Sequence, residues 1–149
     1  MTCCFFGHRD TPISIKKDLR RLLIFLIEEK KADRFLVGNN GNFDRMVIST
    51  LADLKNQYSH LQCYVILQTL PKEGAPALPI ETIFPHGLEN VPPRYAIDKR
   101  NRWMVAHSDA VICYLSRSYG GAAKYCDLAK KQQKQVCNLF SLLSSQKSR

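Results

Sequence analysis

Short apolar runs that alternate with helical segments constrain this chain more than any other feature of its sequence. Strands are expected at residues 3–6, 34–37, 61–67 and 110–115, each followed by a polar or glycine-containing break. Residues 15–31 and the segment after residue 42 carry apolar side chains at the spacing of an amphipathic helix. Because parallel strands need long crossovers that are usually helices, this rhythm predicts an α/β fold with a mainly parallel sheet.

The second half of the chain continues the alternation after one interruption. Helices are expected at residues 93–106 and 122–134, and a fifth short strand at 135–139. Right-handed crossovers then give the strand order 3-2-1-4-5, with the order reversing between the first and fourth strands. Residues 68–93 hold six of the seven prolines and are predicted to form a partly ordered flap over the end of the sheet. We expect residues 1–140 to form a single domain and the serine-rich residues 141–149 to be a flexible tail.

Composition limits the kinds of partner that the chain can have. Its apolar runs are shorter than the roughly 18 residues of a membrane span, and its start does not resemble a signal peptide, so no membrane partner and a cytoplasmic location are expected. The six cysteines form no CxxC pair and no histidines cluster beside them, which favours buried free thiols and predicts neither a metal nor a cofactor. The net charge of +9 reflects either solvated helix faces or attraction of anionic ligands or nucleic acid.

The candidate site lies where three polar loops are expected to meet. In an open α/β sheet, ligands bind beyond the carboxyl ends of the strands at the reversal of strand order, which here joins residues 7–11, 38–43 and 116–121. Glycines allow close approach of a ligand, and the free N–H groups of a helix start bind anions. The candidate ligand-binding residues are Gly7, His8, Arg9, Gly38, Asn39, Gly41, Asp44, Asn101, Ser116, Gly120 and Gly121.

Several of these residues have two possible roles. His8 and Arg9 either hold a turn or present a forked donor to a phosphate or carboxylate. Asp44 either complements a helix N-terminus or accepts a hydrogen bond from a ribose hydroxyl. Asn101 lies in an otherwise apolar helix stripe and therefore needs a partner. Gly120 and Gly121 open a helix directly after a buried strand, so the sequence predicts a pocket for a phosphate-bearing, nucleotide-like small molecule.

Five segments, taken in order, carry a resemblance to a known family. They are Phe6-Gly7-His8-Arg9, the run from Gly38 to Asp44, the run from Arg100 to Met104, Ser108-Asp109-Ala110, and Gly120-Gly121. Together they resemble the SLOG superfamily, whose members are related to the Lonely Guy phosphoribohydrolases and to DNA processing protein A. The small single-domain bacterial members are the most similar. The resemblance implies a Rossmann-like three-layer sandwich that binds a nucleotide or nucleotide-derived ligand at the carboxyl edge of its sheet.

The resemblance also implies catalytic residues. Arg100 matches an arginine that acts in cleavage of an N-glycosidic bond, and Asp127 stands where those enzymes have a glutamate. The glycine turn before Asp127 departs from the enzymes' pattern, with Tyr119, Ala122 and Lys124 in place of proline, glycine and threonine.

Three functions therefore remain open at this point. The first is a binding module or sensor. Assembly of such a module into a homo-oligomer is also open. The second is a phosphoribohydrolase or deoxyribosyltransferase that uses Arg100 with Asp127 or Asp44. The third, ranked after the other two, is nucleic-acid binding, which is suggested by the net charge of +9 and by the relation to DNA processing protein A.

Overall fold

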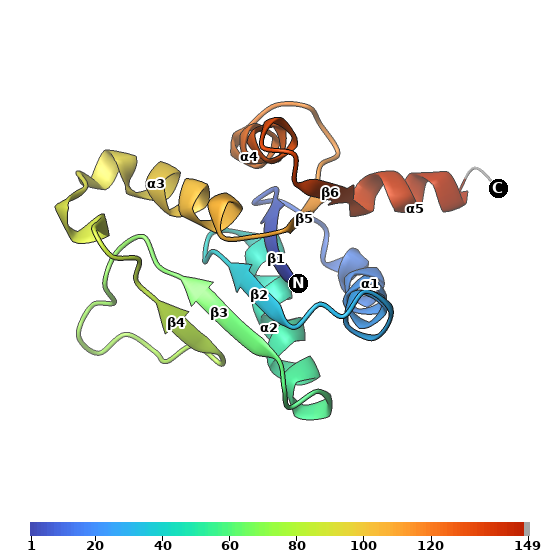
Figure 1. Cartoon of the computed structure of the whole chain (residues 1–149), viewed down its shortest axis with the longest axis horizontal. Helices are drawn as coiled ribbons and strands as arrows, with labels where there is room; N and C mark the ends of the chain where they lie inside the picture. The colour runs from blue at the N-terminus through green and yellow to red at the C-terminus, as the bar shows by residue number, and fades with distance from the viewer. Residues whose placement is uncertain (148–149) are drawn as a thin grey trace.

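A parallel sheet lies between two layers of helices in the computed structural model, which describes residues 1–147 (Figure 1). The strands are β1 (Thr2–Gly7), β2 (Arg34–Val37), β3 (Gln62–Ile66), β4 (Glu81–Ile83), β5 (Ala110–Tyr114) and β6 (Gln135–Asn138). The helices are α1 (Lys16–Glu29), α2 (Asn42–Gln57), α3 (Pro93–Ala106), α4 (Gly121–Lys131) and α5 (Leu139–Lys147), with single 3-10 turns at Ile13–Ile15 and Leu88–Asn90.

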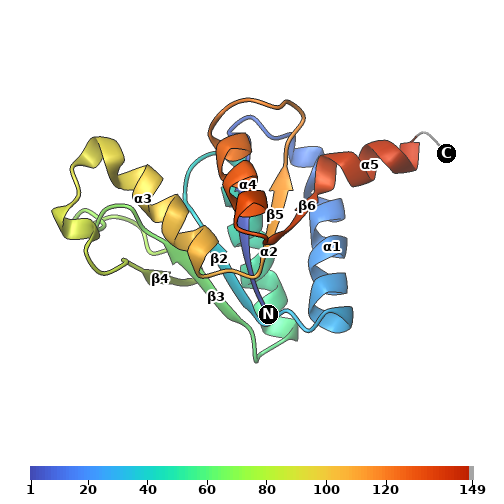
Figure 2. The ribbon, with the colours of Figure 1, turned by 45° about the horizontal axis from the view of Figure 1, so that its top comes forward.

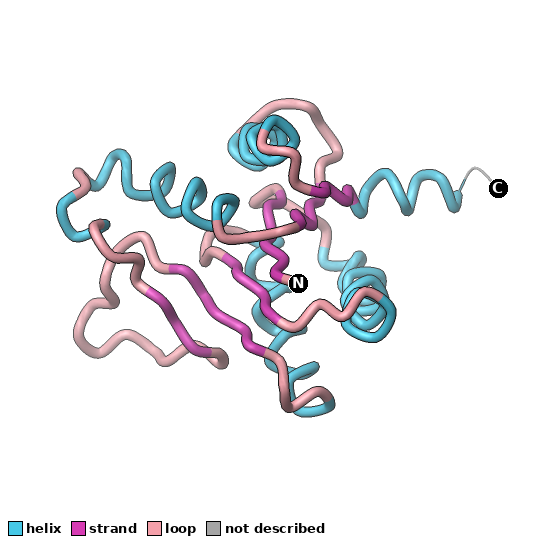
Figure 3. The backbone as a smooth tube through the Cα atoms, viewed as in Figure 1, coloured by secondary structure: helices cyan, strands magenta, loops and turns pink. Residues whose placement is uncertain are grey.

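The sheet has six strands in the order β4-β3-β2-β1-β5-β6, and every neighbouring pair is parallel. Figure 3 marks the strands in magenta. The predicted α/β class is confirmed, and the five predicted strands lie in the predicted order. The central strand β1 pairs with β2 on one side and with β5 on the other, with Cys4 opposite both Leu36 and Val111. The strand order therefore reverses at β1, and the carboxyl end of β1 is where a ligand site is expected.

Alternation along β1 divides the core between the two faces of the sheet. Cys3 and Phe5 pack with the apolar stripes of α1 and α2, whereas Cys4 and Phe6 pack with α3 and α4. Figure 2 shows α4 and α2 on opposite sides of β1. Because side chains alternate along a strand and both faces of β1 are covered, a continuous apolar run is what a strand at this position requires.

Two segments differ from the sequence-based expectations. Within residues 68–93, β4 extends the sheet beyond β3, and the Leu67 N–H donates to the Ile83 carbonyl at 2.8 Å. This strand has three residues between prolines, too few to show an alternating pattern. Residues 141–147, expected to be a flexible tail, belong to α5, which is anchored by buried Leu139 and by Phe140 edge-on to Tyr114. Residues 148 and 149 of the expected tail lie outside the described part of the chain.

The cysteines are free thiols, five of them buried and Cys137 half-buried, as the sequence predicts. Burial raises the pKa of both Cys3 and Cys4 to about 12, so these thiols stay protonated at neutral pH. Among residues 1–147, no helix has both the length and the apolar character that crossing a bilayer requires.

Replacing Gly7 by alanine is expected to destabilise the protein by roughly 1–3 kcal/mol, because overpacking displaces a buried neighbour. A Cβ atom at Gly7 would lie 2.2 Å from the ring of Phe43, which is fully buried. Urea unfolding of the Gly7→Ala protein measures the change. The control is Gly121→Ala, where a Cβ atom meets open space and the φ angle is not left-handed, so no loss is expected. Equal stabilities of the two variants would contradict this packing.

Candidate functional site

A pocket of about 200 Å³ lies at the carboxyl end of β1, where the strand order reverses. We call it the β1 pocket. Its walls come from the end of β1, the loop after β2, and the helices α2, α3 and α4. The lining residues are Phe5, Phe6, Gly7, Arg9, Gly38, Asn40, Asp44, Ile97, Arg100, Asn101, Gly121, Ala122 and Tyr125. Residues far apart in the sequence thus meet where the sequence predicts a ligand site.

The guanidinium of Arg100 is buried behind this pocket and clamps the loops around it. Its Nε donates to Asn101 Oδ1 at 2.8 Å, and its Nη1 donates to the Ile66 carbonyl at 3.1 Å and to Gln68 Oε1 at 2.9 Å. With the Asn40 amide turned as its neighbours require, the amide oxygen accepts from Nη2 at 2.8 Å. Four of the five N–H groups of the guanidinium are therefore used within the protein, which leaves one for a ligand.

Asp44 is a buried carboxylate in the wall of the same pocket. Its Oδ2 accepts from the Asn40 backbone N–H at 2.9 Å, whereas no hydrogen bond within residues 1–147 engages Oδ1. Burial raises the pKa of Asp44 to about 6, although the Asn40 N–H and the charge of Arg100 oppose the rise. A Cβ atom at Gly38 would lie 3.0 Å from both Arg100 Cζ and Asp44 Oδ2, so glycine lets the two charged groups approach each other. The free Oδ1 can accept a hydrogen bond from a ligand hydroxyl.

Arg9 and the start of α4 give the pocket its positive side. The Arg9 carbonyl accepts from the Asn42 N–H at 2.9 Å, which fixes the loop, while its exposed guanidinium has no hydrogen-bond partner in the described part of the chain. No side chain caps α4, whose N-cap Gly120 has a φ of 100°. Gly121 and Ala122 in the first turn therefore present N–H groups without helical acceptors beside the pocket. These N–H groups, the helix dipole and Arg9 together favour an anion.

His8 holds the site together from behind and does not line it. Its buried ring accepts, through Nε2, a hydrogen bond from the Ser116 N–H at 3.2 Å. Burial lowers the pKa of His8, so the ring is neutral and can act as this acceptor. At the surface, Arg117 forms a salt bridge with Asp10, with 3.2 Å between Nη2 and Oδ1. These contacts join the loop after β1 to the loop after β5.

The structure brings together seven of the residues predicted for the site, which are Gly7, Arg9, Gly38, Asp44, Arg100, Asn101 and Gly121. Six others lie outside the β1 pocket, namely His8, Asn39, Gly41, Ser116, Gly120 and Asp127. Gly41 has a φ of 92° and packs its backbone against Arg9, where a Cβ atom would lie 2.6 Å from the Arg9 Cα. Asp127 is exposed in a separate hollow with Arg102 and Lys131, so it is not brought next to Arg100. The proposed roles of these residues stay predictions.

Tyr125 is a pocket residue that the sequence reasoning missed. Its hydroxyl donates to Asp98 Oδ1 at 2.7 Å, and this bond is the main cause that lowers the pKa of Asp98 to about 2. Burial raises the pKa of Tyr125 to about 12. Lys124 of α4 also donates to Asp98 Oδ1, at 3.2 Å, and together with the Tyr125 hydroxyl it ties α4 to α3 at the pocket. The position of Tyr125 one helical turn after Gly121 is the signal that could have identified it.

The arrangement suits binding of an organic anion better than binding of a metal. Nowhere in residues 1–147 do three or more His, Cys, Asp or Glu side chains gather in a way that could hold a metal ion. The pocket combines a positive side at Arg9 and α4 with a carboxylate acceptor at Asp44. A ligand that matches it carries both an anionic group and a hydroxyl donor.

Comparisons with known proteins support the fold class. No model of a known protein family and no curated protein matches the sequence. Among solved structures, the chain is similar to DNA processing protein A from Helicobacter pylori, in a study of the single-stranded DNA binding mode of that protein. The TM-score is 0.61 at 15% sequence identity, over 98% of this chain and 72% of the other. The chain therefore has a Rossmann-like α/β fold of the kind found in DNA processing protein A.

Replacing Asp44 by asparagine is expected to change how stability depends on pH. The folded pKa of about 6 exceeds the ordinary value of 3.8, so the wild-type protein loses stability as pH rises from about 4 through 6. A shift of this size corresponds to a loss on the order of 3 kcal/mol, which the Asp44→Asn protein lacks. The measurement is the free energy of unfolding in urea between pH 4 and 7.5.

The control for this measurement is Asp127→Asn, which removes an exposed carboxylate. It is expected to follow the wild-type pH profile. Parallel profiles for the wild-type and Asp44→Asn proteins would show that Asp44 is not buried as described.

Proposed function

We propose that the chain binds a phosphorylated, nucleotide-derived molecule at the β1 pocket, as a small SLOG-type binding module or sensor. The observation that carries this proposal is that three groups meet in one pocket. They are the Arg9 guanidinium and Asp44 Oδ1, which have no hydrogen-bond partner within residues 1–147, and the α4 N-terminus, which no side chain of that range caps. An anion-binding group and a hydroxyl acceptor in one small pocket match a phosphorylated sugar. The proposal agrees with the family resemblance of the glycine loops.

Different parts of the pocket would bind the phosphate and the sugar of the ligand. A phosphate takes charge-assisted hydrogen bonds from Arg9 and from the Gly121 and Ala122 N–H groups. A sugar hydroxyl donates to Asp44 Oδ1. Gly7 and Gly38 leave room in the pocket wall for the Phe43 ring and for Arg100 beside Asp44. The net charge of +9 attracts such an anion over a longer range.

Cleavage of an N-glycosidic bond is a further step that the same pocket would have to support. Asp44 is the carboxylate that lines it, and its Oδ1 is free, whereas Asp127 lies in another hollow. If the chain is an enzyme of this type, Asp44 is therefore the better candidate to stabilise or attack the sugar carbon. Release of free base from nucleoside monophosphates, followed by chromatography, tests this role.

Single-stranded nucleic acid is a second candidate ligand. It is favoured by the fold similarity to DNA processing protein A, whose structure was studied for its single-stranded DNA binding, and by the net charge of +9. In this alternative, Arg9 and the α4 N-terminus would hold a backbone phosphate, and other exposed basic residues would follow the strand.

Replacing Arg9 by glutamine is expected to weaken binding of ribose 5-phosphate and of nucleoside 5′-monophosphates by about 10-fold or more, because a charge-assisted hydrogen bond is lost. Calorimetric titration measures the change. The control is Arg45→Gln, because Arg45 is exposed on α2, donates to Asn42 Oδ1 and does not line the pocket. Wild-type protein that binds none of these phosphates at millimolar concentration would refute the proposed function.

Oligonucleotide titrations are expected to separate the two candidate ligands. If the second candidate holds, affinity for a 20-nucleotide poly-dT strand exceeds that for its mononucleotide and falls steeply as salt is raised from 50 to 200 mM. Fluorescence anisotropy at several salt concentrations measures both properties. Equal affinity for strand and mononucleotide would remove nucleic acid as the ligand and leave the small molecule.

A further inference from the structure

The β1 pocket has room for only part of a nucleotide. Pockets that enclose a complete small ligand usually measure about 300–1,000 Å³, whereas this one measures about 200 Å³. That volume suits a sugar phosphate, so the base of a bound nucleotide has to lie elsewhere.

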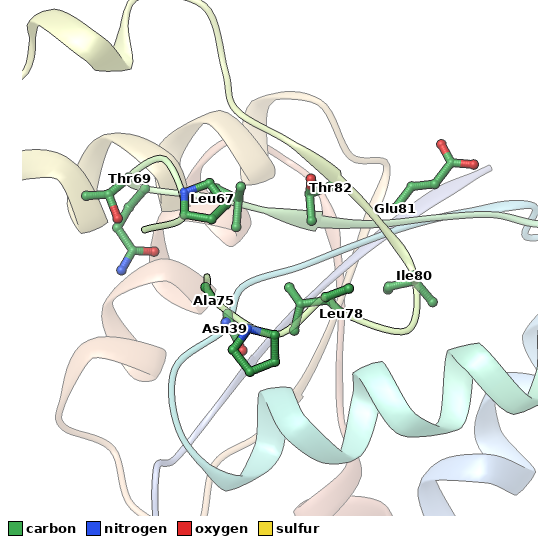
Figure 4. A pocket seen from close by; sticks show the side chains of 12 residues that line it. Asn39, Leu67, Thr69, Ala75, Leu78, Ile80, Glu81 and Thr82 are labelled. Atoms are coloured by element: carbon green, nitrogen blue, oxygen red, sulfur yellow. The ribbon is translucent and has the colours of Figure 1, made fainter. Parts of the chain in front are cut away.

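A larger hollow of about 670 Å³ opens beside the carboxyl end of β3, and we call it the β3 cavity (Figure 4). One side is the end of β3 and the start of β4, and the other is the segment 71–80. The lining residues are Asn39, Leu67, Gln68, Thr69, Pro71, Ala75, Pro76, Ala77, Leu78, Ile80, Glu81 and Thr82.

The β1 pocket and the β3 cavity share their dividing wall. Asn40 lines the first and its neighbour Asn39 lines the second. Gln68 lines the β3 cavity, and its Oε1 accepts from Arg100, which lines the β1 pocket. The Asn39–Asn40 turn and the Gln68–Arg100 hydrogen bond therefore lie between the β1 pocket and the β3 cavity.

The lining of the β3 cavity fits an uncharged aromatic ring. Leu78 and Ile80 supply apolar contact, as Figure 4 shows. The Asn39 side-chain amide and the Gln68 Nε2 group have no hydrogen-bond partner within residues 1–147. Among the residues that the structure describes, no lysine or arginine lines the cavity and the one charged lining residue is Glu81, so the cavity does not favour a phosphate. Apolar walls with free amide groups are what a nucleobase requires, because its faces are apolar and its edges donate and accept hydrogen bonds.

We propose that the β3 cavity binds the base of the nucleotide whose sugar phosphate occupies the β1 pocket. This inference rests on the proposed function and adds to it a base-recognition site formed by residues 67–82 and Asn39. The proline-rich segment is then part of the binding site, because it forms one wall of the base-binding cavity.

The wall formed by residues 71–80 is held to the rest of the cavity by few backbone contacts. Within it, the Ala75 N–H donates to the Lys72 carbonyl at 3.0 Å, and Gly74 has a φ of 82°. Segments with few backbone hydrogen bonds open at low free-energy cost. Such a wall can adjust to bases of different size.

Filling the β3 cavity is expected to remove the contribution of the base and to spare that of the sugar phosphate. Ala75 is exposed and lines the cavity, so Ala75→Trp places a large ring there. We expect wild-type protein to bind adenosine or uridine 5′-monophosphate at least about 10-fold more tightly than ribose 5-phosphate. In the Ala75→Trp protein this difference is lost, while affinity for ribose 5-phosphate is unchanged. Calorimetry with the three ligands measures the difference.

The matched control is Glu73→Trp, which adds the same ring two residues away at an exposed position that does not line the cavity. It is expected to keep wild-type affinities for all three ligands. A nuclear Overhauser contact from base protons to the Leu78 methyl groups in wild-type protein is the expected direct readout.

Two outcomes would overturn the base site while leaving the proposed function intact. One is equal affinity of wild-type protein for ribose 5-phosphate and the nucleotides, and the other is unchanged nucleotide binding in the Ala75→Trp protein. If ribose 5-phosphate and the nucleotides all fail to bind wild-type protein, the proposed function falls and the base site falls with it.

Discussion

The site depends on the hydrogen bonds that the buried guanidinium of Arg100 makes. Burying a charge requires that its N–H groups find acceptors, and here they find the Ile66 carbonyl, Gln68, Asn40 and Asn101. All four acceptors are neutral, so Asp44 receives the field of Arg100 without a hydrogen bond from it. Burial outweighs that field, so the pKa of Asp44 is raised. One side chain thus fixes the loops after β2 and β3 and limits the rise in the pKa of the neighbouring carboxyl group.

The loops at the carboxyl edge are held in place by polar contacts that leave the pocket open. His8 accepts from the Ser116 N–H, and Asn138 bonds both the N–H and the carbonyl of Leu115, at 3.0 and 3.1 Å. These residues fix the positions of Arg9 and of the α4 N-terminus without occupying the space before them. Loops held in this way lose little conformational freedom when a ligand binds.

The fold similarity and the side chains of the β1 pocket bear on different properties of the protein. A likeness of 15% identity to DNA processing protein A shows the Rossmann-like fold, and folds of this type host many functions. The proposal for a nucleotide-derived ligand instead rests on Arg9, Asp44 and the uncapped α4 in one small pocket, with the β3 cavity beyond the Asn39–Asn40 turn. The proposed ligand therefore depends on these side chains and not on the overall similarity of the fold.

The sequence by itself determined the sheet and the edge of the sheet at which its polar loops meet. Residues 34–37 and 93–106 form the predicted strand and helix, because apolar runs and helical periodicity record burial directly. Adjacent loop residues could not be separated in this way: Arg9, Asn40 and Gly121 line the β1 pocket, whereas His8, Asn39 and Gly120 do not. Their directions are set by loop dihedral angles and by partners distant in the chain, such as Ser116 for His8 and Arg100 for Asn40. Only the tertiary structure brings those partners together, and it alone decided that Asp44, and not Asp127, lines the pocket.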